Sequence, residues 1–391
     1  MKWALIGASD IAATRLIPAM RELGHEVYGV MSSNADRAKS YAAKNGIPNF
    51  TVSLDEAVNW PVDAVYISTT NELHARQAIA AARAKKHVLC EKPLSLTIKT
   101  GQIMLDAAKR TGMTLATAEN YRRGGANRVA RAVIESGMLG KLHLMIEMWA
   151  GGDDKIIISK WRHMKESGSI GIDMSIHYAD IIEYFVGPVE RVWGRGIIAE
   201  PIRYSKDGDE SIIPTGEDAL FASMRTADGI DVQYTYLPSG PGISHRQRSL
   251  HGTKGSMLVP GDRSDGDVVV QLGERKLMGA ELIAEIAKTG THLNINDVTK
   301  AVLGPDGTGG KGAPWAAVDS GYLAVEIDDF IDAVLNKRAP EVDGMGGLRA
   351  LAVVYAILES GVAGREVSVD EVLTGKIHAY QDEIDQSLER R

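Results

Sequence analysis

The chain has 391 residues, a length typical of two domains. Hydrophobic residues make up 44% and charged residues 24% of it, the balance of an ordinary soluble globular protein. The net charge of -7 excludes a global positive field that would attract nucleic acid or an anionic membrane.

Cysteine content and the N-terminal stretch indicate where the protein works. The single cysteine, Cys90, excludes an internal disulfide framework and fits a reducing cytoplasm. The first apolar run is interrupted by Gly7 and Asp10, so it does not predict a signal peptide. No run approaches the roughly 18 apolar residues that cross a bilayer. We therefore expect a cytoplasmic protein with no membrane partner.

The first 120 residues alternate between short apolar runs and amphipathic runs. The apolar runs predict strands at 3–7, 26–32, 64–69, 87–90 and 113–119. The amphipathic runs predict helices at 10–24, 34–46, 72–84 and 97–111. This βαβ alternation predicts a parallel sheet with helices on both faces, a doubly wound α/β fold.

After residue 122 the pattern changes to one helix followed by β-rich runs. A helix is predicted at 125–139, and strands at 142–150, 190–198, 219–226, 230–237, 246–259 and 267–272. Segment 275–320 is predicted to be irregular, with a helical stretch and a Gly-rich surface loop at 304–315. Helices at 322–337 and 346–362 close the chain.

These patterns divide the chain at residue 121. Residues 1–121 are predicted to be a dinucleotide-binding domain. Residues 122–391 are predicted to be an α/β domain with an open, mostly antiparallel sheet, which binds substrate and forms oligomers; the last helices can pack back on the first domain.

The turn after the first strand resembles a dinucleotide-binding loop. The fingerprint G-x-G-x-x-G/A lets the backbone approach the pyrophosphate at a helix N-terminus. Here Gly7 starts the motif, Ser9 replaces the second glycine and Ala12 takes the third position. The alternative is a tight βα turn without a ligand.

The end of the second strand bears on the choice between NAD and NADP. An NAD site usually has an acidic residue there that binds the ribose 2′-hydroxyl. This chain has Ser32, Ser33 and Asn34, with Arg37 just inside the next helix, and a guanidinium suits a 2′-phosphate. The alternative is a helix cap with a solvated arginine. We expect NADP(H) in preference to NAD(H).

Polar residues also follow the third and fourth strands. "STTNELH" (68–74) ends the third strand, where hydroxyl and amide groups face the ligand crevice, and Asn71 suits a helix cap. "EKP" ends the fourth strand, where Lys92 can donate a proton to a developing alkoxide. Glu91 can orient that lysine or balance its charge.

A second candidate group lies in "GIDMSIH" (171–177). In a helix, Asp173 and His177 would be i,i+4 neighbours, and a carboxylate beside an imidazole is a usable acid/base pair. The alternatives are a surface salt link, two metal ligands, or an aspartate near a helix N-terminus. The histidines show no metal-ligand spacing, so no metal site is predicted. The basic stretch 121–128 is interpreted as a solvated helix start in which one arginine or Tyr121 can line the cleft.

Taken in order, these motifs resemble the Gfo/Idh/MocA oxidoreductase family. The matching stretches are "ALIGASDIA", "DAVYISTTNELH", "AKKHVLCEKPLSLT", "GIDMSIHYADII" and "HGTKGSMLV". The N-terminal half is most similar to an NADPH-dependent sugar reductase of the family. The resemblance implies a Rossmann domain followed by an open-sheet α/β domain, with substrate bound between them.

The resemblance also implies roles for individual residues. Lys92 would be the catalytic lysine, His177 the proton donor or acceptor, and Asp173 a positioning residue. The residues expected to bind cofactor, with the 2′-phosphate on Ser32 and Arg37, are Gly7, Ala8, Ser9, Asp10, Ile11, Ser32, Ser33, Arg37, Thr69, Thr70, Asn71, His74, Glu91, Lys92 and Asn120. The residues expected to contact substrate are Tyr121, Trp161 and Arg162.

The expected activity is hydride transfer to or from a hydroxyl or carbonyl carbon of a sugar, polyol or glycoside. One alternative is an oxidoreductase that processes glycosides with tightly bound NAD. Another is a dinucleotide-binding sensor without catalysis. By analogy with the fold, a homo-oligomer (dimer or tetramer) through the C-terminal sheet is expected.

Overall fold

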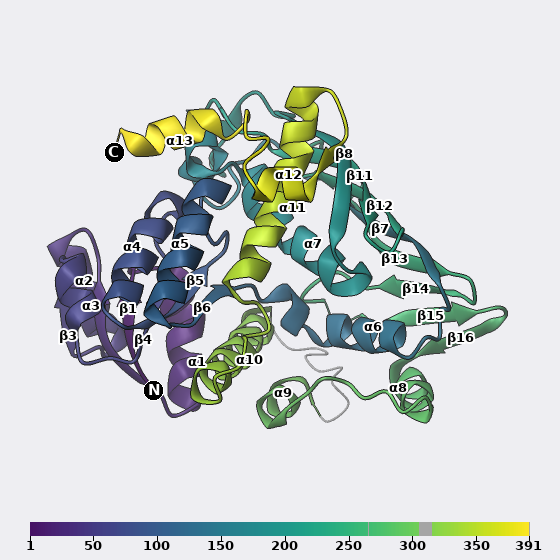
Figure 1. Cartoon of the computed structure of the whole chain (residues 1–391), viewed down its shortest axis with the longest axis horizontal. Coiled ribbons are helices and arrows are strands. Elements are labelled where there is room, and N and C mark those ends of the chain that lie inside the picture. Colours follow the sequence, from purple (N-terminus) through teal and green to yellow (C-terminus); the bar gives the residue numbers. More distant parts are fainter. Residues whose placement is uncertain (265, 305–314, 391) are drawn as a thin grey trace. The chain divides into compact units, whose positions relative to one another are not determined.

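A computed structural model of the chain describes residues 1–264, 266–304 and 315–390 (Figure 1). The chain folds as two units. The first unit consists of Met1–Asn120 and Ala313–Leu348, and the second of Tyr121–Gly312 and Arg349–Arg391. The long helix α11 therefore begins in one unit and continues in the other.

The first unit is built on a six-stranded, fully parallel sheet in the order β3-β2-β1-β4-β5-β6. Its strands are β1 (Lys2–Ile6), β2 (Glu26–Met31), β3 (Asn49–Thr51), β4 (Ala64–Ile67), β5 (His87–Glu91) and β6 (Leu115–Ala118). This is the strand order of the dinucleotide-binding fold, in which the order reverses between β1 and β4. The predicted doubly wound sheet is confirmed.

Helices connect these strands, as the amphipathic runs predict. They are the π-helical turn η1 (Ala12–Leu16), α1 (Ile17–Glu22), α2 (Ala35–Asn45), α3 (Leu54–Asn59), α4 (Asn71–Arg83) and α5 (Ile98–Thr111). Gly46 and Gly112 end α2 and α5 in left-handed conformations that cost glycine no steric strain. The expectation for Asn71 is wrong: Thr70 is the N-cap of α4, and Asn71 is already helical. The sequence also did not predict the short elements β3 and α3.

A late segment of the chain completes the first unit. Helix α10 (Trp315–Leu335) packs against η1 and α1, and Phe330 on α10 lies with its ring 5.3 Å from that of Trp3. The chain then reaches the β6 edge, where the Thr117 amide donates to the Val342 carbonyl (3.1 Å). Apolar side chains from residues 315–348 therefore finish the core of a sheet made by the first 120 residues.

The second unit is built on a nine-stranded sheet in the order β16-β15-β14-β13-β7-β12-β11-β8-β17. All neighbours are antiparallel except β7 and β12, which run parallel, so the predicted open and mostly antiparallel sheet is confirmed. Its strands are β7 (Leu142–Ala150), β8 (Val189–Ile197), β11 (Ala219–Thr226), β12 (Asp231–Leu237), β13 (His245–Gly252), β14 (Ser256–Val259), β15 (Val269–Leu272), β16 (Arg275–Met278) and β17 (Val367–Ser368). A separate small hairpin pairs β9 (Arg203–Tyr204) with β10 (Ser211–Ile212).

The two faces of the large sheet differ because side chains alternate along each strand. On β12, Val232, Tyr234 and Tyr236 are buried on the face that α7 (Ile170–Val186) covers. On the opposite face Trp193 of β8 and Leu258 of β14 are 56% and 50% exposed. The remaining helical elements of this unit are η2 (Tyr121–Arg123), α6 (Gly125–Glu135), η3 (Lys160–His163), η4 (Lys165–Ser167), α8 (Gly279–Lys288), α9 (Asp297–Leu303), the larger part of α11 (Gly344–Ala363), α12 (Val369–Leu373) and α13 (Asp382–Glu389).

Two expectations for the late part of the chain need correction. Segment 275–320 is not irregular in its described residues, because it begins with strand β16 and continues with α8 and α9. Most of the predicted Gly-rich loop, residues 305–314, lies outside the described residues. Helix α11 is long and apolar enough to cross a membrane by composition, with a mean hydropathy of 1.4, contrary to the expectation that no run of the chain approaches that length. It is 72% buried within the protein, as a core helix is.

Candidate active site

The turn between β1 and η1 has the backbone geometry of a ligand-binding loop. Gly7 has φ of +116°, and a Cβ at this position would lie 2.7 Å from the Ser68 carbonyl oxygen. No other residue fits here, because the left-handed conformation and the close approach each exclude a side chain. The Ser9 hydroxyl donates to Ser68 Oγ (2.8 Å), which joins the carboxyl ends of β1 and β4. This is the edge at which dinucleotides bind in such sheets.

Side chains from α2 hold the same loop from outside. Arg37 Nη2 donates to the Ala8 carbonyl (2.7 Å), and the Tyr41 hydroxyl donates to the Ser9 carbonyl (2.9 Å). The Arg37 side chain remains exposed, and Asn34 caps α2 by accepting from the Arg37 amide. A helix cap and an arginine at the cofactor loop are alternatives in the sequence analysis. Both are present, because Asn34 caps α2 and the Arg37 guanidinium lies beside the loop. Ser32 is buried and Ser33 exposed.

The turn after β4 is tied to the turn after β5. His74 is fully buried, with Nδ1 3.0 Å from the Pro93 carbonyl and Nε2 3.3 Å from the Thr69 carbonyl. Burial lowers the pKa of His74, although both carbonyl contacts oppose this effect. Thr69 donates to Gln77 (2.6 Å) and Thr70 to Glu72 (2.8 Å). His74 thus acts as a bridge that fixes the Lys92–Pro93 segment.

The segment of Glu91 and Lys92 ends β5, and its Lys92–Pro93 peptide bond is cis. The Tyr66 hydroxyl donates to Glu91 Oε1, and the Lys92 amide donates to Glu91 Oε2 (3.2 Å). Burial raises the pKa of Glu91, while Tyr66 and the Lys92 ammonium oppose the rise. The Glu91 carboxylate is thus held between the Tyr66 hydroxyl and the Lys92 backbone amide.

Asn120 follows β6 and is linked through α10 to η1, the helical turn that follows the glycine loop after β1. Its Nδ2 lies 3.4 Å from Asp319 Oδ1, and Asp319 is 3.6 Å from Arg15 Nε of η1. Asp319 is 1% exposed, so this carboxylate is a buried connection between the end of β6 and the helical turn that follows Gly7. No sequence motif points to Arg15 or Asp319, which lie about 300 positions apart.

In the second unit, Asp173 and His177 lie in the first half of α7 and are 1% and 6% exposed. The helix begins at Ser169, whose hydroxyl caps the Ile172 amide, so Asp173 is in the first turn. A carboxylate there is stabilised by the helix dipole. Arg162 Nε lies 3.3 Å from Asp173 Oδ2, and its guanidinium stacks 4.3 Å over the Trp161 ring. The structure thus brings Asp173 together with the adjacent Trp161 and Arg162, which the sequence analysis assigned to a different role.

Tyr121 packs directly against His177. Their rings are parallel within 4°, with centroids 4.0 Å apart. The Arg263 guanidinium lies 4.9 Å from the centre of the Tyr121 ring and donates to the Tyr121 hydroxyl (3.3 Å). Tyr236 also belongs here, because the Asp173 carboxylate adds to the burial that raises the Tyr236 pKa. Neither Arg263 nor Tyr236 stood out in the sequence.

The basic stretch after Tyr121 is not solvated, contrary to expectation. Arg122 forms a two-point ion pair with Asp180 of α7, and Arg123 and Arg128 are 2% and 4% exposed. Asp180 lies one turn beyond His177 on α7. The stretch therefore anchors α7 and contributes to the core.

Comparison with known proteins agrees with this arrangement. A family model described as an oxidoreductase family with an NAD-binding Rossmann fold matches residues 1–119, and the model of its C-terminal α/β domain matches 131–369. The chain belongs to the Gfo/Idh/MocA oxidoreductase family. The predictions that it resembles this family and is an oxidoreductase are confirmed.

Within the Gfo/Idh/MocA family several characterised relatives are similar to this chain. The 1,5-anhydro-D-fructose reductase of Ensifer adhaerens is 34% identical over 66% of this chain and 75% of its own length. The levoglucosan dehydrogenase of Pseudarthrobacter phenanthrenivorans is 25% identical over 88% and 89% of the two chains. A structure of levoglucosan dehydrogenase with NADH and L-sorbose superimposes with a TM-score of 0.79, at 23% identity over 96% and 100% of the chains. That superposition shows the shared fold.

Proposed function

We propose that this protein transfers a hydride between NADP(H) and a hydroxyl- or carbonyl-bearing carbon of a sugar, polyol or glycoside. The observation that carries the proposal is that one chain contains both a glycine loop at the edge of a parallel sheet and, in its second unit, a helix with the buried Asp173 and His177. Named relatives support the substrate class, since they include a reductase of anhydrofructose, a levoglucosan dehydrogenase and a myo-inositol 2-dehydrogenase from Thermotoga maritima.

Residues 1–121 bind the dinucleotide in this proposal, and residues 122–391 bind the substrate. When bound, the cofactor supplies or accepts the hydride. Because Gly7 has no side chain, the backbone of the loop can approach the pyrophosphate closely. Arg37, exposed beside Ala8, supplies a guanidinium for a 2′-phosphate, which is why NADP(H) is preferred over NAD(H).

Proton transfer at the substrate oxygen is assigned to Lys92 and His177. Lys92 donates a proton to the oxygen in the reductive direction, and Glu91 accepts from its backbone amide. His177 is the second proton donor or acceptor at this oxygen, and the Tyr121 ring fixes the orientation of its imidazole. Asp173 binds a substrate hydroxyl or maintains the position of His177, while Arg162 balances its charge.

The outer face of the nine-stranded sheet is assigned to a homo-oligomer. This face carries exposed apolar side chains such as Trp193 and Leu258. Sedimentation of the wild-type protein and of Trp193→Glu tests the assignment. We expect the wild-type protein to sediment as a dimer or tetramer and the variant to dissociate. A monomeric wild-type protein would exclude the assignment of this face to an oligomer.

A substrate screen tests the proposed activity. Sugars, polyols and glycosides are incubated with NAD⁺, NADP⁺ or their reduced forms, and the absorbance of reduced nicotinamide is followed. Turnover with NADP(H) is expected for at least one class. Cofactor that remains bound through purification would favour the alternative with tightly held NAD, and complete inactivity with retained cofactor binding would favour a sensor.

A further inference from the structure

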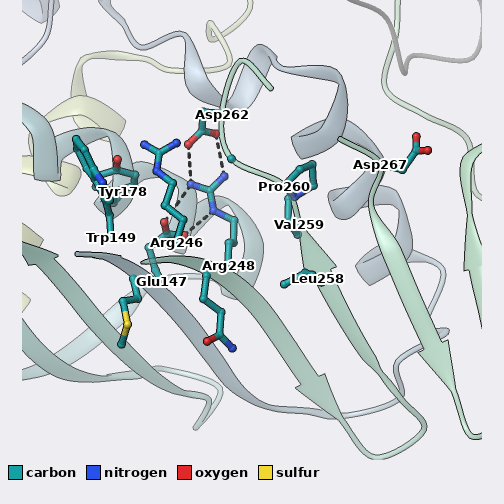
Figure 2. Close-up of a pocket in the computed structure, with 13 residues that line it drawn as sticks. Glu147, Trp149, Tyr178, Arg246, Arg248, Leu258, Val259, Pro260, Asp262 and Asp267 are labelled. Atoms are coloured by element: carbon teal, nitrogen blue, oxygen red, sulfur yellow. Dashed lines mark hydrogen bonds and ion pairs between the residues drawn. The ribbon is translucent and has the colours of Figure 1, made fainter. Parts of the chain in front are cut away.

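A cavity of about 170 Å³ opens in the second unit between strands β7, β13 and β14 and helix α7. Its walls carry Glu147, Trp149, Tyr178, Arg246, Arg248 and Asp262, and Figure 2 shows these side chains around the opening. A water molecule occupies roughly 30 Å³ in the liquid, so the cavity holds several waters or part of a small molecule. None of these residues has a role in the site described above.

Arg248 is fully committed to two carboxylates. It donates to Glu147 through Nε (2.5 Å) and Nη2 (3.2 Å), and to Asp262 through Nη1 and Nη2 (both 2.8 Å). Asn127 completes the cluster by accepting from Arg248 Nη1 (3.0 Å). Burial opposes ionisation of Asp262, but Arg248 outweighs it and holds the Asp262 pKa below its usual range. Glu147 and Asp262 are therefore occupied by Arg248.

Arg246, two residues earlier on the same face of β13, is a different kind of arginine. Its guanidinium lies 4.8 Å over the Trp149 ring, and it makes no hydrogen bond or ion pair to any described residue. A Cβ on Gly261 would lie 2.9 Å from Arg246 Nη1, so the loop after β14 passes close to the guanidinium. An aromatic platform fixes the plane of the fork and leaves its N–H groups available.

Tyr178 provides a second donor on the same wall, as Figure 2 shows beside Trp149 and Arg246. It is 2% exposed, and its hydroxyl has no hydrogen-bond partner among the described residues. Burial, followed by nearby groups that include Asp262, raises the Tyr178 pKa well above its usual value, although Arg246 opposes the rise. The hydroxyl therefore stays protonated, and a buried donor of this kind requires an acceptor.

A continuous series of aromatic contacts links this wall to His177. Trp149 meets Tyr236 edge-on (5.2 Å), Tyr236 contacts Tyr178 (6.1 Å), and Tyr178 contacts Tyr121 edge-on (6.1 Å). Tyr121 in turn stacks on His177. Within the second unit, the rings of Tyr178 and Tyr121 therefore connect the cavity wall to His177, the proposed proton-transfer group.

We propose that this cavity binds a carboxylate of the substrate, and that the protein therefore acts on sugar acids such as uronates or their glycosides. The Arg246 fork donates to the two carboxylate oxygens, and the Tyr178 hydroxyl donates to one of them. A carboxylate fits better than a phosphate dianion for two reasons. Of the two arginines in the cavity wall, Arg246 alone is not bonded to a carboxylate of any described residue, and the nearby Glu147 and Asp262 would repel a dianion more strongly than a monoanion. This inference rests on the proposed oxidoreductase function and narrows its substrate class.

The experiment compares sugar pairs that differ only in a terminal carboxylate: glucuronate with glucose, galacturonate with galactose, and methyl β-glucuronide with methyl β-glucoside. For each pair kcat/KM with NADP⁺ is measured, and binding to the protein–NADP⁺ complex is measured by calorimetry. At least one acid is expected to bind on the order of 10- to 100-fold tighter than its neutral partner, which is the contribution of charged hydrogen bonds. This preference should weaken as salt is raised.

Variants identify the group responsible. Arg246→Gln is expected to remove the preference for the acid, and Arg246→Lys to restore part of it, with NADP⁺ affinity unchanged. Arg225→Gln is the matched control, because Arg225 is 61% exposed on β11 and, among the residues that the structure describes, forms its ion pair with Asp231. Loss of acid binding in Arg246→Gln supports the inference even if no sugar is turned over, in which case the oxidoreductase proposal fails alone. Neutral sugars that bind as tightly as their acids, or equal losses for both in Arg246→Gln, would overturn the inference and leave the proposed function intact.

Discussion

The ring of Tyr121 lies parallel to the imidazole of His177 at a centroid distance of 4.0 Å. A stacked aromatic ring restricts the imidazole to one plane. The ring nitrogens can therefore exchange a proton only with a substrate oxygen that lies close to that plane. The hydroxyl of the same tyrosine accepts from Arg263, which keeps the Tyr121 ring in place.

Replacing Tyr121 by leucine tests this constraint. Tyr121→Leu is expected to lower kcat on the order of tenfold, since such stacking contributes about 0.5–1.5 kcal/mol, and to alter the pH profile of kcat. Tyr121→Phe keeps the stack and should retain most of the activity. A leucine variant with wild-type kcat and pH profile would show that the stack does not orient His177.

Removing the ammonium of Lys92 tests its assignment as proton donor. Lys92→Met should lower kcat on the order of 10²-fold, while titration of nicotinamide fluorescence shows nearly unchanged cofactor affinity. Lys109→Met, on an exposed position of α5, is the control. Undiminished turnover in Lys92→Met would remove Lys92 from the mechanism.

The cofactor preference depends on Arg37. Arg37→Ala is expected to weaken NADPH binding on the order of 10- to 100-fold and NADH binding much less, because only NADPH carries the 2′-phosphate. Lys39→Ala, exposed on the same helix, should change neither. Equal losses for the two dinucleotides would mean that Arg37 only supports the loop through Ala8.

A buried ion pair in the second unit predicts a large effect on stability. Arg203 and Asp218 are both 0% exposed and 2.8 Å apart, and Asp218 also accepts from the amides of Ala199 and Glu200. Asp218→Asn should lower the free energy of unfolding by about 3–5 kcal/mol in urea titration, because it leaves a buried guanidinium without its counter-charge. Asp231→Asn, which breaks the exposed pair with Arg225, should cost less than about 1 kcal/mol. Similar losses in both variants would contradict this difference.

His163 makes stability depend on pH. Its Nε2 accepts from the Ile157 amide (3.0 Å), and burial, followed by the charge of Arg203, lowers its pKa from 6.5 to about 4. The folded protein therefore binds fewer protons than the unfolded chain between these values, and this contribution is fully present above pH 6.5 and lost as the pH falls towards 4. At about 1.4 kcal/mol per pKa unit, the loss is on the order of 3 kcal/mol. Urea unfolding between pH 4 and 7 should show this slope in the wild type, and a flatter curve is expected for His163→Gln. An equal slope in both would assign the effect to other groups.

Much of the fold could be predicted because its signals are local. The alternation of apolar and amphipathic runs predicted β1, β2, β4, β5 and β6 with their helices, and β7 and β11 at their observed bounds. Short elements such as β3 and α3 escaped, because three to six residues carry too little periodicity. Segment 275–320 looked irregular because a four-residue strand and its flanking glycines resemble a loop.

Prediction of the site had a different limit. Lys92, Asp173 and His177 lie in motifs, so the sequence named them. Arg263, Tyr236 and Arg246 act through partners distant in the sequence, and single positions on alternating strands give no sign of which neighbours they meet. The arginines after Tyr121 were misjudged for the same reason, since Asp180 neutralises Arg122 only once α7 has folded against it.

The contribution of α10 to the first unit has a consequence for biosynthesis. The sheet formed by the first 120 residues lacks the Phe330 ring over Trp3 and the Asp319 carboxylate that joins Asn120 to Arg15 until the ribosome has passed residue 335. At about 5–20 residues per second, this delay lasts many seconds. The unit that begins the chain is thus among the last to be completed, and premature termination anywhere before α10 yields a nucleotide-binding sheet with an unfinished core.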